Sequence, residues 1–562
     1  MKHCFDILKN KKLGSTIYIL IGVLLALLNA FSASYFQKVL DDFGESSLSK
    51  KTIAVYAIVL ILIGGLSYFD EYPGANLSEG IYLDFKLKAM EKMSTIDYQA
   101  YQSLGTGSLV QKIENGASSG KRILFDFYFR LFRELLPSML FSLIFIARIS
   151  KDIMIYIALG YIVIFVVTNL LLKYLYHIKA QILNNEEIFN KYLIRSFTEL
   201  VVFRIHKKFP KEISKATNAA EQIVHSKTKM TLIHEAFFAV FAFFVTLIKV
   251  VILFASWKSG SISVGALVAL LTLTDKAYSP IAIFNVLFVQ YKLDRSAFAR
   301  YSDFLALPDD LMLGIGGNLE SVEGNLSFKN VYFSYEEKQL FTNLSFDIPA
   351  GTSVALIGES GSGKTTIVKQ IIGLLKPDSG TIYLDTTEMS EINLHQLYNH
   401  VSYTSQDSPI FDGTLRENIV FDAKFSDDKI LEALDNVGLT AFYQALPNGL
   451  STEVGEKGGM LSGGERQRIA LARLYFSEAR IVILDEATSA MDNVTEKLVM
   501  KNLMRFLKKK TIITIAHRLH TITEFEKIYV FKEGRIVGEG CFRELMEHNA
   551  YFGQLWHAAS EK

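Results

Sequence analysis

Long apolar runs in residues 1–300 constrain the fold of this chain more than any other feature of the sequence. An apolar helix of about 20 residues is long enough to cross the hydrocarbon core of a lipid bilayer. One such run is also typical of a buried helix in a soluble protein, but six in succession predict a helical membrane domain. The runs are residues 13–37, 52–69, 135–147 with an extension back to 123, 153–172, 236–257 and 259–291.

The spacing of these runs is uneven. Short gaps follow the first, third and fifth runs, whereas the second and fourth are followed by residues 70–134 and 173–235, which are polar and mostly helical in pattern. At 1.5 Å per residue, each leg of such a helical hairpin reaches about 40 Å beyond the bilayer. We expect a short helix at each tip, near residues 104–109 and 195–206, which either docks on a soluble domain or lies in solvent.

Three charged residues interrupt the last two apolar runs: Lys249, Asp275 and Lys276. Charged side chains within membrane spans usually face a water-filled cavity or a partner. We therefore predict that Lys249 and Asp275 line a substrate pathway or pair within it. The alternative is a purely structural ion pair, or a lysine whose ammonium group reaches the membrane surface.

The character of the chain changes near residue 307. Residues 307–324 contain a proline, acidic residues and several glycines, as is typical of a linker. From residue 325 onward the pattern is that of a soluble α/β domain. We thus expect a multidomain chain, with an all-α transmembrane domain of six helices over 1–306, the linker, and an α/β domain over 325–562.

A glycine-rich loop is the most informative motif of the α/β part. It joins a short apolar strand, 354–357, to a helical pattern, 367–375, as a phosphate-binding loop does. Glycines let backbone N–H groups turn toward an anion at a helix N-terminus. Lys364 is placed to reach the β- and γ-phosphates of a nucleotide, and the Thr365 hydroxyl to coordinate Mg²⁺. The residues expected to bind the nucleotide here are Gly358, Glu359, Ser360, Gly361, Ser362, Gly363, Lys364, Thr365 and Thr366.

Four further candidates lie at or near the ends of predicted strands. Residues 481–486 form a buried-strand pattern ending in two acids, of which Asp485 is placed to hold Mg²⁺ and Glu486 to orient or deprotonate the attacking water. A second apolar strand ends at His517, which we expect near the γ-phosphate. Upstream, Tyr335 is either a stacking partner for adenine or an ordinary aromatic strand residue.

A second motif with anion-binding character precedes the helical pattern 469–476. Its backbone N–H groups and hydroxyl again lie at the N-terminus of a helix. One nucleotide does not need two such ends from the same chain, so the motif indicates two copies of the domain that complete each other's sites. The motif consists of Leu461, Ser462, Gly463, Gly464 and Glu465.

Together, these motifs resemble those of ABC transporters. Residues 325–562 look like their nucleotide-binding domain, a P-loop ATPase, and residues 1–300 resemble the six-helix transmembrane domain of exporter-type half-transporters with the type IV fold. In the terms of this family, residues 358–365 are similar to the Walker A motif and 481–486 to the Walker B motif. Residues 461–465 resemble the signature motif, whose last residue is usually glutamine.

The resemblance also suggests roles for residues outside these motifs. Gln406 matches the Q-loop glutamine, which contacts Mg²⁺ and senses the transmembrane domain. Tyr335 matches the adenine-stacking residue, and His517 the switch histidine. Residues 489–492 resemble the D-loop, which ends in Asp492, and residues 452–456 the X-loop that meets the coupling helices of exporters.

What the resemblance implies is an ATP-driven exporter that uses ATP and Mg²⁺ and moves an amphipathic compound, such as a drug-like molecule, peptide or lipid, by alternating access. Its partners would be a second copy of itself, with a heterodimer as the alternative, and the lipid bilayer. The expected location is the plasma or inner membrane, with the ATPase domain and both termini in the cytosol. An ATP-gated regulator or channel without pumping is the other function that the motifs allow.

The net charge and the cysteine content bear on three other features: a nucleic-acid partner, a disulfide framework and a metal site. The formal net charge is +1, which gives no indication of a nucleic-acid partner. The two cysteines, Cys4 and Cys541, lie near opposite ends of the chain and predict neither a disulfide framework nor a metal site.

Overall fold

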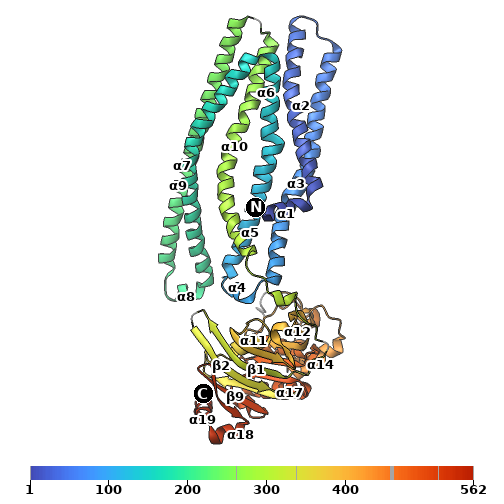
Figure 1. Cartoon of the computed structure of the whole chain (residues 1–562), viewed down its shortest axis with the longest axis vertical. Coiled ribbons are helices and arrows are strands. Elements are labelled where there is room, and N and C mark those ends of the chain that lie inside the picture. Colours follow the sequence, from blue (N-terminus) through green and yellow to red (C-terminus); the bar gives the residue numbers. More distant parts are fainter. Residues whose placement is uncertain are drawn as a thin grey trace. The chain divides into compact units, whose positions relative to one another are not determined.

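The structure is a computed structural model of the chain, and it divides into two compact units (Figure 1). The first comprises Met1–Ser94 and Leu104–Leu307, and the second Thr95–Ser103 and Pro308–Lys562. The structure describes residues 2–104, 106–260, 262–319, 321–336, 338–455, 461–516 and 518–560. Within these ranges it leaves out the side chains of residues 106–108, 165, 167–177, 180, 183, 259, 559 and 560.

The first unit consists of helices (Figure 1). The two long helices α7 and α9 lie side by side, and α10 packs against α2, α5 and α6. The helices up to residue 305, including α4 of the second unit, are α1 (Lys2–Asn10), α2 (Lys12–Gly44), α3 (Lys50–Thr95), α4 (Tyr98–Gln102), α5 (Thr106–Lys121), the π-helical turns η1 (Arg122–Phe129) and η2 (Leu131–Leu135), α6 (Leu136–Ile149), α7 (Lys151–Thr198), α8 (Leu200–Ile205), α9 (Phe209–Ser259) and α10 (Val264–Leu305).

Each of the six predicted apolar runs lies largely in these helices. Among the described residues, four helices are long and apolar enough to cross a membrane: α2, α3, α9 and α10. The run 153–172 lies in α7, where many side chains are not described, and the run 135–147 lies in a helical stretch in which η1 and η2 lead into α6. The prediction of a helical membrane domain is confirmed, although four helices rather than six meet these criteria by their described residues alone.

The start of the sixth run was predicted too early. Gly260 has a φ of 61°, a left-handed conformation that ends α9, so the segment after it leaves the helix. The hydroxyl of Ser263 then accepts a hydrogen bond from the backbone N–H of Ala266 and caps α10. The predicted run 259–291 is therefore helical again only from Val264.

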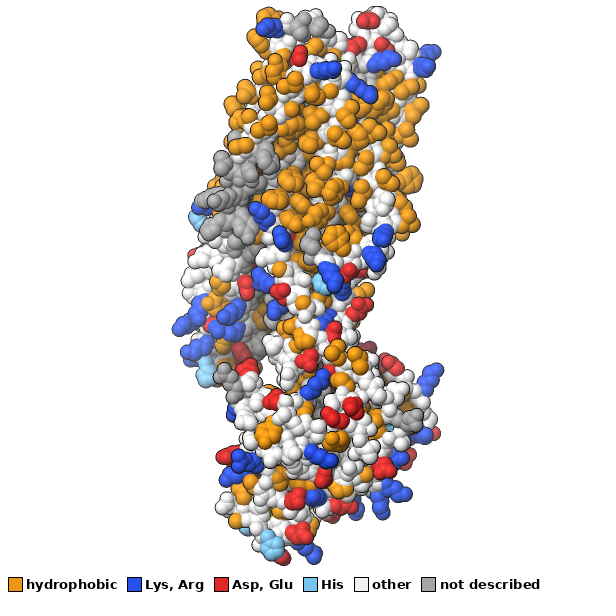
Figure 2. All heavy atoms as spheres, viewed as in Figure 1, with side chains coloured by type: hydrophobic (Ala, Val, Ile, Leu, Met, Phe, Trp, Pro, Cys, Tyr) orange, Lys and Arg blue, Asp and Glu red, His pale blue; other side chains and the backbone are white. Residues whose placement is uncertain are grey.

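Hydrophobic side chains cover much of the visible face of the helical unit (Figure 2). Among the exposed hydrophobic residues of this unit, Leu62 is 49% exposed, Phe69 71% and Phe254 63%. A continuous apolar surface of this extent is unusual on a protein that is surrounded by water, because it leaves apolar area hydrated. It is the surface that contact with lipid chains requires.

A short helix lies in each hairpin: α8 lies within the predicted tip 195–206, whereas α4 ends before the predicted tip 104–109. The helix α4 begins at Asp97, whose carboxylate accepts hydrogen bonds from the backbone N–H groups of Gln99 and Ala100. It belongs to the second unit, where Tyr98 packs against the core and the Lys369 ammonium lies 5.5 Å from its ring centroid. This helix is thus docked on the α/β unit rather than solvated.

The second unit contains two β-sheets (Figure 1). The six-stranded sheet has the order β10-β9-β3-β8-β7-β6 and is parallel except for β10, and the four-stranded sheet is antiparallel with the order β2-β1-β4-β5. The strands are β1 (Leu326–Tyr335), β2 (Lys338–Ile348), β3 (Ser353–Gly358), β4 (Ser379–Leu384), β5 (Thr387–Glu388), β6 (Val401–Thr404), β7 (Ile481–Asp485), β8 (Thr511–Ile515), β9 (Lys527–Lys532) and β10 (Arg535–Gly540).

Every residue of β7 and β8 is buried, as expected for central parallel strands covered on both faces. Because β3, β6, β7 and β8 are parallel, the segments that follow them meet at one edge of the sheet, where ligands bind in folds of this type. The helices of this unit after α4 are α11 (Lys364–Ile371), α12 (Leu394–His400), α13 (Leu415–Val420), α14 (Asp427–Asn436), α15 (Thr440–Gln444), α16 (Gly463–Ala472), α17 (Asn493–Phe506), α18 (Phe542–His548) and α19 (Ala550–Ser560).

Candidate nucleotide-binding site

The glycine-rich loop joins β3 to α11, as predicted. Gly358 has a φ of 147° and Gly363 a φ of 105°, values that side chains disfavour. A Cβ atom on Gly358 would lie 2.2 Å from the carbonyl oxygen of Phe531, and one on Gly363 would lie 2.4 Å from the ring of Phe341. The course of the loop therefore depends on glycine at both positions.

Lys364 is the first residue of α11 and is only 6% exposed. Its Nζ donates hydrogen bonds of 2.9 Å to the carbonyl oxygens of Gly358 and Glu359. Burial lowers the pKa of this lysine, and two nearby carboxylates oppose that effect. The ammonium group thus lies within the loop itself.

A cavity of about 270 Å³ lies against the loop. Tyr335, at the end of β1, contributes one wall, and its hydroxyl lies 3.2 Å from Oγ1 of Thr366. The cavity therefore combines an aromatic ring, the glycine-rich loop and an acid that follows β7. The residues that line it are Tyr335, Lys338, Leu340, Ser360, Gly361, Gly363, Lys364, Thr365, Thr366 and Glu486, with none from 461–465.

Asp485 is the last residue of β7 and is 4% exposed. The hydroxyl of Tyr403, on the neighbouring strand β6, donates a hydrogen bond of 3.2 Å to its Oδ2. Burial raises the pKa of Asp485, and the hydrogen bond from Tyr403 opposes this shift in part. A divalent cation close to this carboxylate would favour its charged form.

Glu486 has a φ of 51°, which is uncommon for a residue with a side chain. Its backbone N–H donates to the carbonyl oxygen of Ile515 at 3.2 Å, and this bond ties the residue to the end of β8. Its carboxylate accepts a hydrogen bond of 2.9 Å from Nε2 of Gln406. The structure therefore brings Gln406, from the loop after β6, to Glu486, which directly follows Asp485 at the end of β7.

The motif 461–465 forms the N-terminus of α16. The Ser462 hydroxyl accepts a hydrogen bond from the Glu465 N–H at 3.3 Å, while the Glu465 carboxylate accepts from the N–H and hydroxyl of Ser462 at 2.7 and 2.8 Å. This reciprocal arrangement is a capping box. It means that Glu465 competes with any outside anion for the Ser462 hydroxyl.

Asp492 serves as the cap of α17. Its Oδ1 accepts hydrogen bonds from the backbone N–H groups of Val494 and Thr495 at 3.1 and 2.9 Å. These bonds lower the pKa of the carboxyl group. The predicted switch residue His517 lies outside the described residues, as does Glu456 of the predicted X-loop.

Lys249 of α9 and Asp275 of α10 form an ion pair, with Nζ 2.7 Å from Oδ1. The Asp275 side chain is 56% exposed, so the pair lies at the surface of the helical unit. Lys276 makes a different contact, donating a hydrogen bond of 2.7 Å to the carbonyl oxygen of Asn29. Lys249 and Asp275 are thus paired, as both the pathway prediction and the structural alternative allow, and their place in a substrate pathway stays a prediction.

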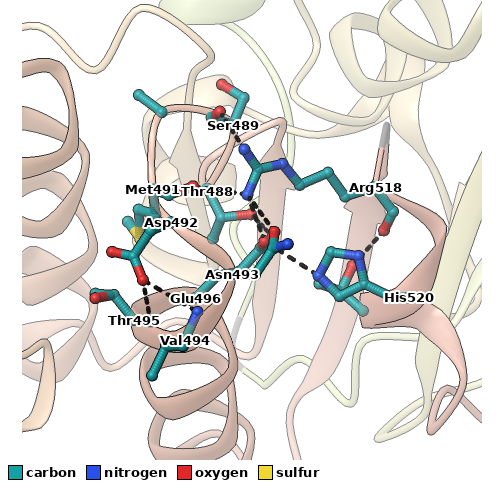
Figure 3. A network of polar contacts seen from close by, with 12 residues as sticks. Thr488, Ser489, Met491, Asp492, Asn493, Val494, Thr495, Glu496, Arg518 and His520 are labelled. Carbon is teal, nitrogen blue, oxygen red and sulfur yellow. Dashed lines mark hydrogen bonds and ion pairs between the residues drawn. The ribbon is translucent and has the colours of Figure 1, made fainter. Parts of the chain in front are cut away.

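Residues that were not predicted from the sequence contact the segment that follows Glu486. Gln467 is 4% exposed; its Nε2 donates to Oγ of Ser489 at 2.9 Å, and its Oε1 accepts from the Ala490 N–H at 2.8 Å. Only helical spacing, four residues after Gly463, points to it in the sequence. Nearby, the half-buried Arg518 forms an ion pair with the fully buried Glu496, which no local motif indicates (Figure 3).

Comparison with known proteins agrees with this architecture. Residues 341–489 match the family model described as "ABC transporter", and residues 15–275 match that described as "ABC transporter transmembrane region". A solved structure titled "Structure of a bacterial Atm1-family ABC exporter with ATP bound" matches with a TM-score of 0.80 and 21% identity, over 98% of each chain.

Curated relatives match over a shorter length. The aligned part is 41% identical over 245 residues to "Iron-sulfur clusters transporter ATM1, mitochondrial" of Debaryomyces hansenii, which is 43% of this chain and 35% of that protein. It is 38% identical over 242 residues to "ATP-dependent lipid A-core flippase" of Francisella tularensis, which is 43% of this chain and 40% of that protein. The chain thus matches less than half the length of these two relatives.

The fold and the site together define a multi-pass membrane protein that is fused to an α/β domain with a phosphate-binding loop. The two family models cover most of the chain, one on each part. The chain belongs to the ABC transporter family, as a half-transporter with the exporter fold.

Proposed function

We propose that this chain is an ATP-driven exporter in which ATP hydrolysis drives alternating access of the membrane helices. The observation that carries the proposal is the cavity that combines Tyr335, the glycine-rich loop and Glu486, in a chain that also bears helices of membrane-spanning length. The proposed parts are the transmembrane domain over 1–306, the linker over 307–324 and the ATPase domain over 325–562.

The cavity fits a nucleoside triphosphate. Tyr335 would stack on the base, and the residues 358–366 would hold the phosphates through backbone N–H groups and the Lys364 ammonium. Burial disfavours the charged form of this ammonium group, and the negative charge of a bound polyphosphate would favour it.

The residues around the cavity also fit Mg²⁺. Thr365, Asp485 and Gln406 offer the oxygen atoms that this ion prefers, and among the described residues no group of three acids, histidines or cysteines forms a separate metal site. Such a donor set is typical of magnesium that is held jointly by the protein and by phosphates. When bound, the ion would neutralise charge on the phosphates.

Glu486 would act as the base that orients and deprotonates the attacking water. It lines the cavity and is anchored by its own backbone and by Gln406. His517 would contact the γ-phosphate and hold the geometry of the same water. Proton transfer by a positioned group contributes roughly 10²–10⁴-fold to a rate.

A dimer would complete each site. The N-terminus of α16, with Leu461, Ser462, Gly463, Gly464 and Glu465, offers a second anion-binding end, and none of these residues lines the cavity of its own chain. We therefore propose a homodimer in which ATP is held between 358–366 of one copy and 461–465 of the other, with Asp492 near the contact. ATP would favour this closed arrangement over an open one.

The substrate is proposed to be an amphipathic compound taken from the cytosol or the inner leaflet, of the lipid, peptide or drug type. Lys249 and Asp275 are candidates for its pathway, because charged residues within membrane spans are energetically costly and usually mark functional sites. The proposed location is the plasma or inner membrane, with the ATPase domain in the cytosol.

One experiment tests the activity, and a second tests the shared sites. The first measures ATP hydrolysis and concentrative uptake into inside-out vesicles, across lipids, peptides and drugs. Substrate-stimulated hydrolysis without uptake would favour the ATP-gated regulator. The second mixes a Lys364→Ala chain with a Ser462→Ala chain, both inactive alone. Rescue in the mixed dimer is expected if each site uses two chains, and no rescue would contradict shared sites.

A further inference from the structure

Glu496 is an acid that the proposed reaction does not use, yet it is completely buried, with 0% exposure, in the first turn of α17. Its Oε1 accepts a hydrogen bond of 2.6 Å from the Thr488 hydroxyl, and its Oε2 accepts one of 2.9 Å from Nη1 of Arg518 (Figure 3). The ring of His520 approaches the same oxygen, with Nε2 at 3.3 Å. A buried carboxylate is costly unless it is paired and hydrogen-bonded, and here both conditions are met.

Arg518 extends from this pair to the backbone of residues 489–492. Its Nη1 donates to the carbonyl oxygen of Met491 at 2.7 Å, and its Nη2 donates to that of Ser489 at 3.2 Å (Figure 3). A guanidinium group presents its N–H donors in a fixed planar fork, so the bond from Nη1 to Glu496 sets the direction of the remaining donors. The pair thus fixes two carbonyl groups of one short segment.

The same segment is held from its other side by the helix that carries the signature-like motif. Gln467 of α16 bonds to the Ser489 hydroxyl and to the N–H of Ala490. A Cβ atom on Gly464 would lie 3.1 Å from the carbonyl oxygen of Ala490, so α16 and the segment are in close contact. Residues 489–492 therefore make polar contacts with both α16 and Arg518.

The segment is also continuous with the proposed base. The N–H of Ser489 donates to the carbonyl oxygen of Glu486 at 3.2 Å. Glu486, Glu496 and Arg518 line one small cavity of about 20 Å³. Thr488 and Ser489 line the same cavity. Neither Glu496 nor Arg518 lines the larger cavity beside the glycine-rich loop.

From these contacts we propose that Glu496 and Arg518 form a positioning pair that sets the backbone of residues 489–492 and, through it, the orientation of Glu486. The proposal rests on the proposed ATPase function. The pair would affect turnover, because it contacts the segment that continues from the proposed base. It would leave nucleotide binding largely unaffected, because neither residue lines the nucleotide cavity. Small displacements of a reacting group can cost about 10²-fold in rate.

The test uses the full chain in lipid nanodiscs. Glu496→Gln keeps the shape of the side chain but removes its charge, and Arg518→Lys keeps the charge but removes the fork. Each change is expected to lower kcat at least about tenfold, with KM for ATP and the thermal unfolding temperature little changed. The double variant should lose no more than the stronger single variant, because coupled residues are not additive. Arg505→Lys and Glu432→Gln, which replace exposed residues of α17 and α14, are the matched controls.

Hydrogen exchange of the amides of residues 489–492 provides a readout that does not depend on activity. We expect faster exchange in Glu496→Gln and in Arg518→Lys than in the two controls. Unchanged exchange, or a kcat at the control level with a lowered unfolding temperature, would overturn the positioning role. If the unaltered protein hydrolysed no ATP, the proposed function would fail, while exchange would still decide whether the pair holds the segment.

Discussion

The side-chain amide of Gln406 donates a hydrogen bond of 2.9 Å to the carboxylate of Glu486 and so joins the loop after β6 to the loop after β7. An amide has two different ends, because its nitrogen donates and its oxygen accepts. With the nitrogen on Glu486, the oxygen remains available to a cation. Gln406 can therefore restrain the proposed base and contribute to the proposed magnesium site at the same time.

This dual contact predicts two separable effects of changing Gln406. Gln406→Ala should lower kcat and raise the Mg²⁺ concentration needed for half-maximal hydrolysis. Gln406→Glu retains a metal-binding oxygen but repels Glu486, so it should lower kcat with a smaller change in the Mg²⁺ requirement. Magnesium titrations of ATPase activity measure both quantities. Equal effects of the two substitutions on both would argue against a dual role.

The proposed base gives the second prediction. Glu486→Gln should bind ATP with an affinity close to that of the unaltered protein, because the side chain keeps its volume and its place in the cavity. Hydrolysis should fall by roughly 10²-fold or more, because the amide cannot accept a proton. Equilibrium nucleotide binding and single-turnover kinetics separate the two quantities. Substantial residual hydrolysis would remove Glu486 from this role, and Glu547→Gln, at an exposed glutamate, is the control.

Glu465 is the basis of the third prediction. Its carboxylate holds the Ser462 hydroxyl at 2.8 Å and would place a negative charge close to the phosphates of a nucleotide bound by a partner. Glu465→Gln keeps an oxygen for the capping box but removes the charge, so KM for ATP should fall about several-fold, most clearly at low salt. Steady-state kinetics at two salt concentrations test this. A rise in KM would show that the carboxylate assists binding.

The fourth prediction is that the Asp485 carboxylate lowers the stability of the nucleotide-free protein, although hydrolysis requires it. Because burial raises its pKa, the folded protein binds a proton at this site more readily than the unfolded chain does. The ionised carboxylate therefore destabilises the nucleotide-free protein above the raised pKa, and this effect disappears below the unfolded value of about 3.9. Asp485→Asn should accordingly unfold at a higher temperature at pH 7, with a difference that shrinks as the pH is lowered, and should lose Mg²⁺-dependent hydrolysis. A lower unfolding temperature at pH 7 would contradict this reasoning.

The ion pair between the membrane helices supplies the fifth prediction. Lys249→Met leaves the Asp275 charge without its lysine, and Asp275→Asn does the converse, so each single change should reduce substrate-stimulated hydrolysis. The double variant should recover part of it, because an unpaired charge at membrane depth costs more than none. Transport assays with the substrate found by screening measure the effect. Changes in folding yield with unaltered stimulation would favour a purely structural pair.

Several structural features follow from short stretches of sequence. The apolar runs specify helices of membrane-spanning length, because a helix in lipid must satisfy its own backbone hydrogen bonds. The spacing of Gly358, Gly363 and Lys364 specifies a phosphate-binding loop, since the loop needs positive φ angles at the glycines and a lysine at the start of a helix. The strands 481–485 and 511–515 could likewise be predicted, because central parallel strands are apolar throughout.

Helix boundaries and long-range contacts were less accessible to sequence reasoning. The sixth apolar run continues across Gly260 in sequence, but the left-handed backbone of this residue ends one helix before Ser263 begins the next. The contact of Tyr403 with Asp485 depends on the pairing of β6 with β7, which are 80 residues or so apart in the chain. Sequence spacing alone contains no information on such a pairing.

The sequence by itself determined which chemical groups this protein has for binding a nucleotide and which segments can enter a membrane, because these properties depend on residue type and local period. Only the tertiary structure decided that Gln406 reaches Glu486, that Lys249 pairs with Asp275, and that Glu496 and Arg518 hold residues 489–492. The physical reason is that each of these contacts joins side chains from separate elements. Its geometry exists only after strand order and helix packing have brought those elements together.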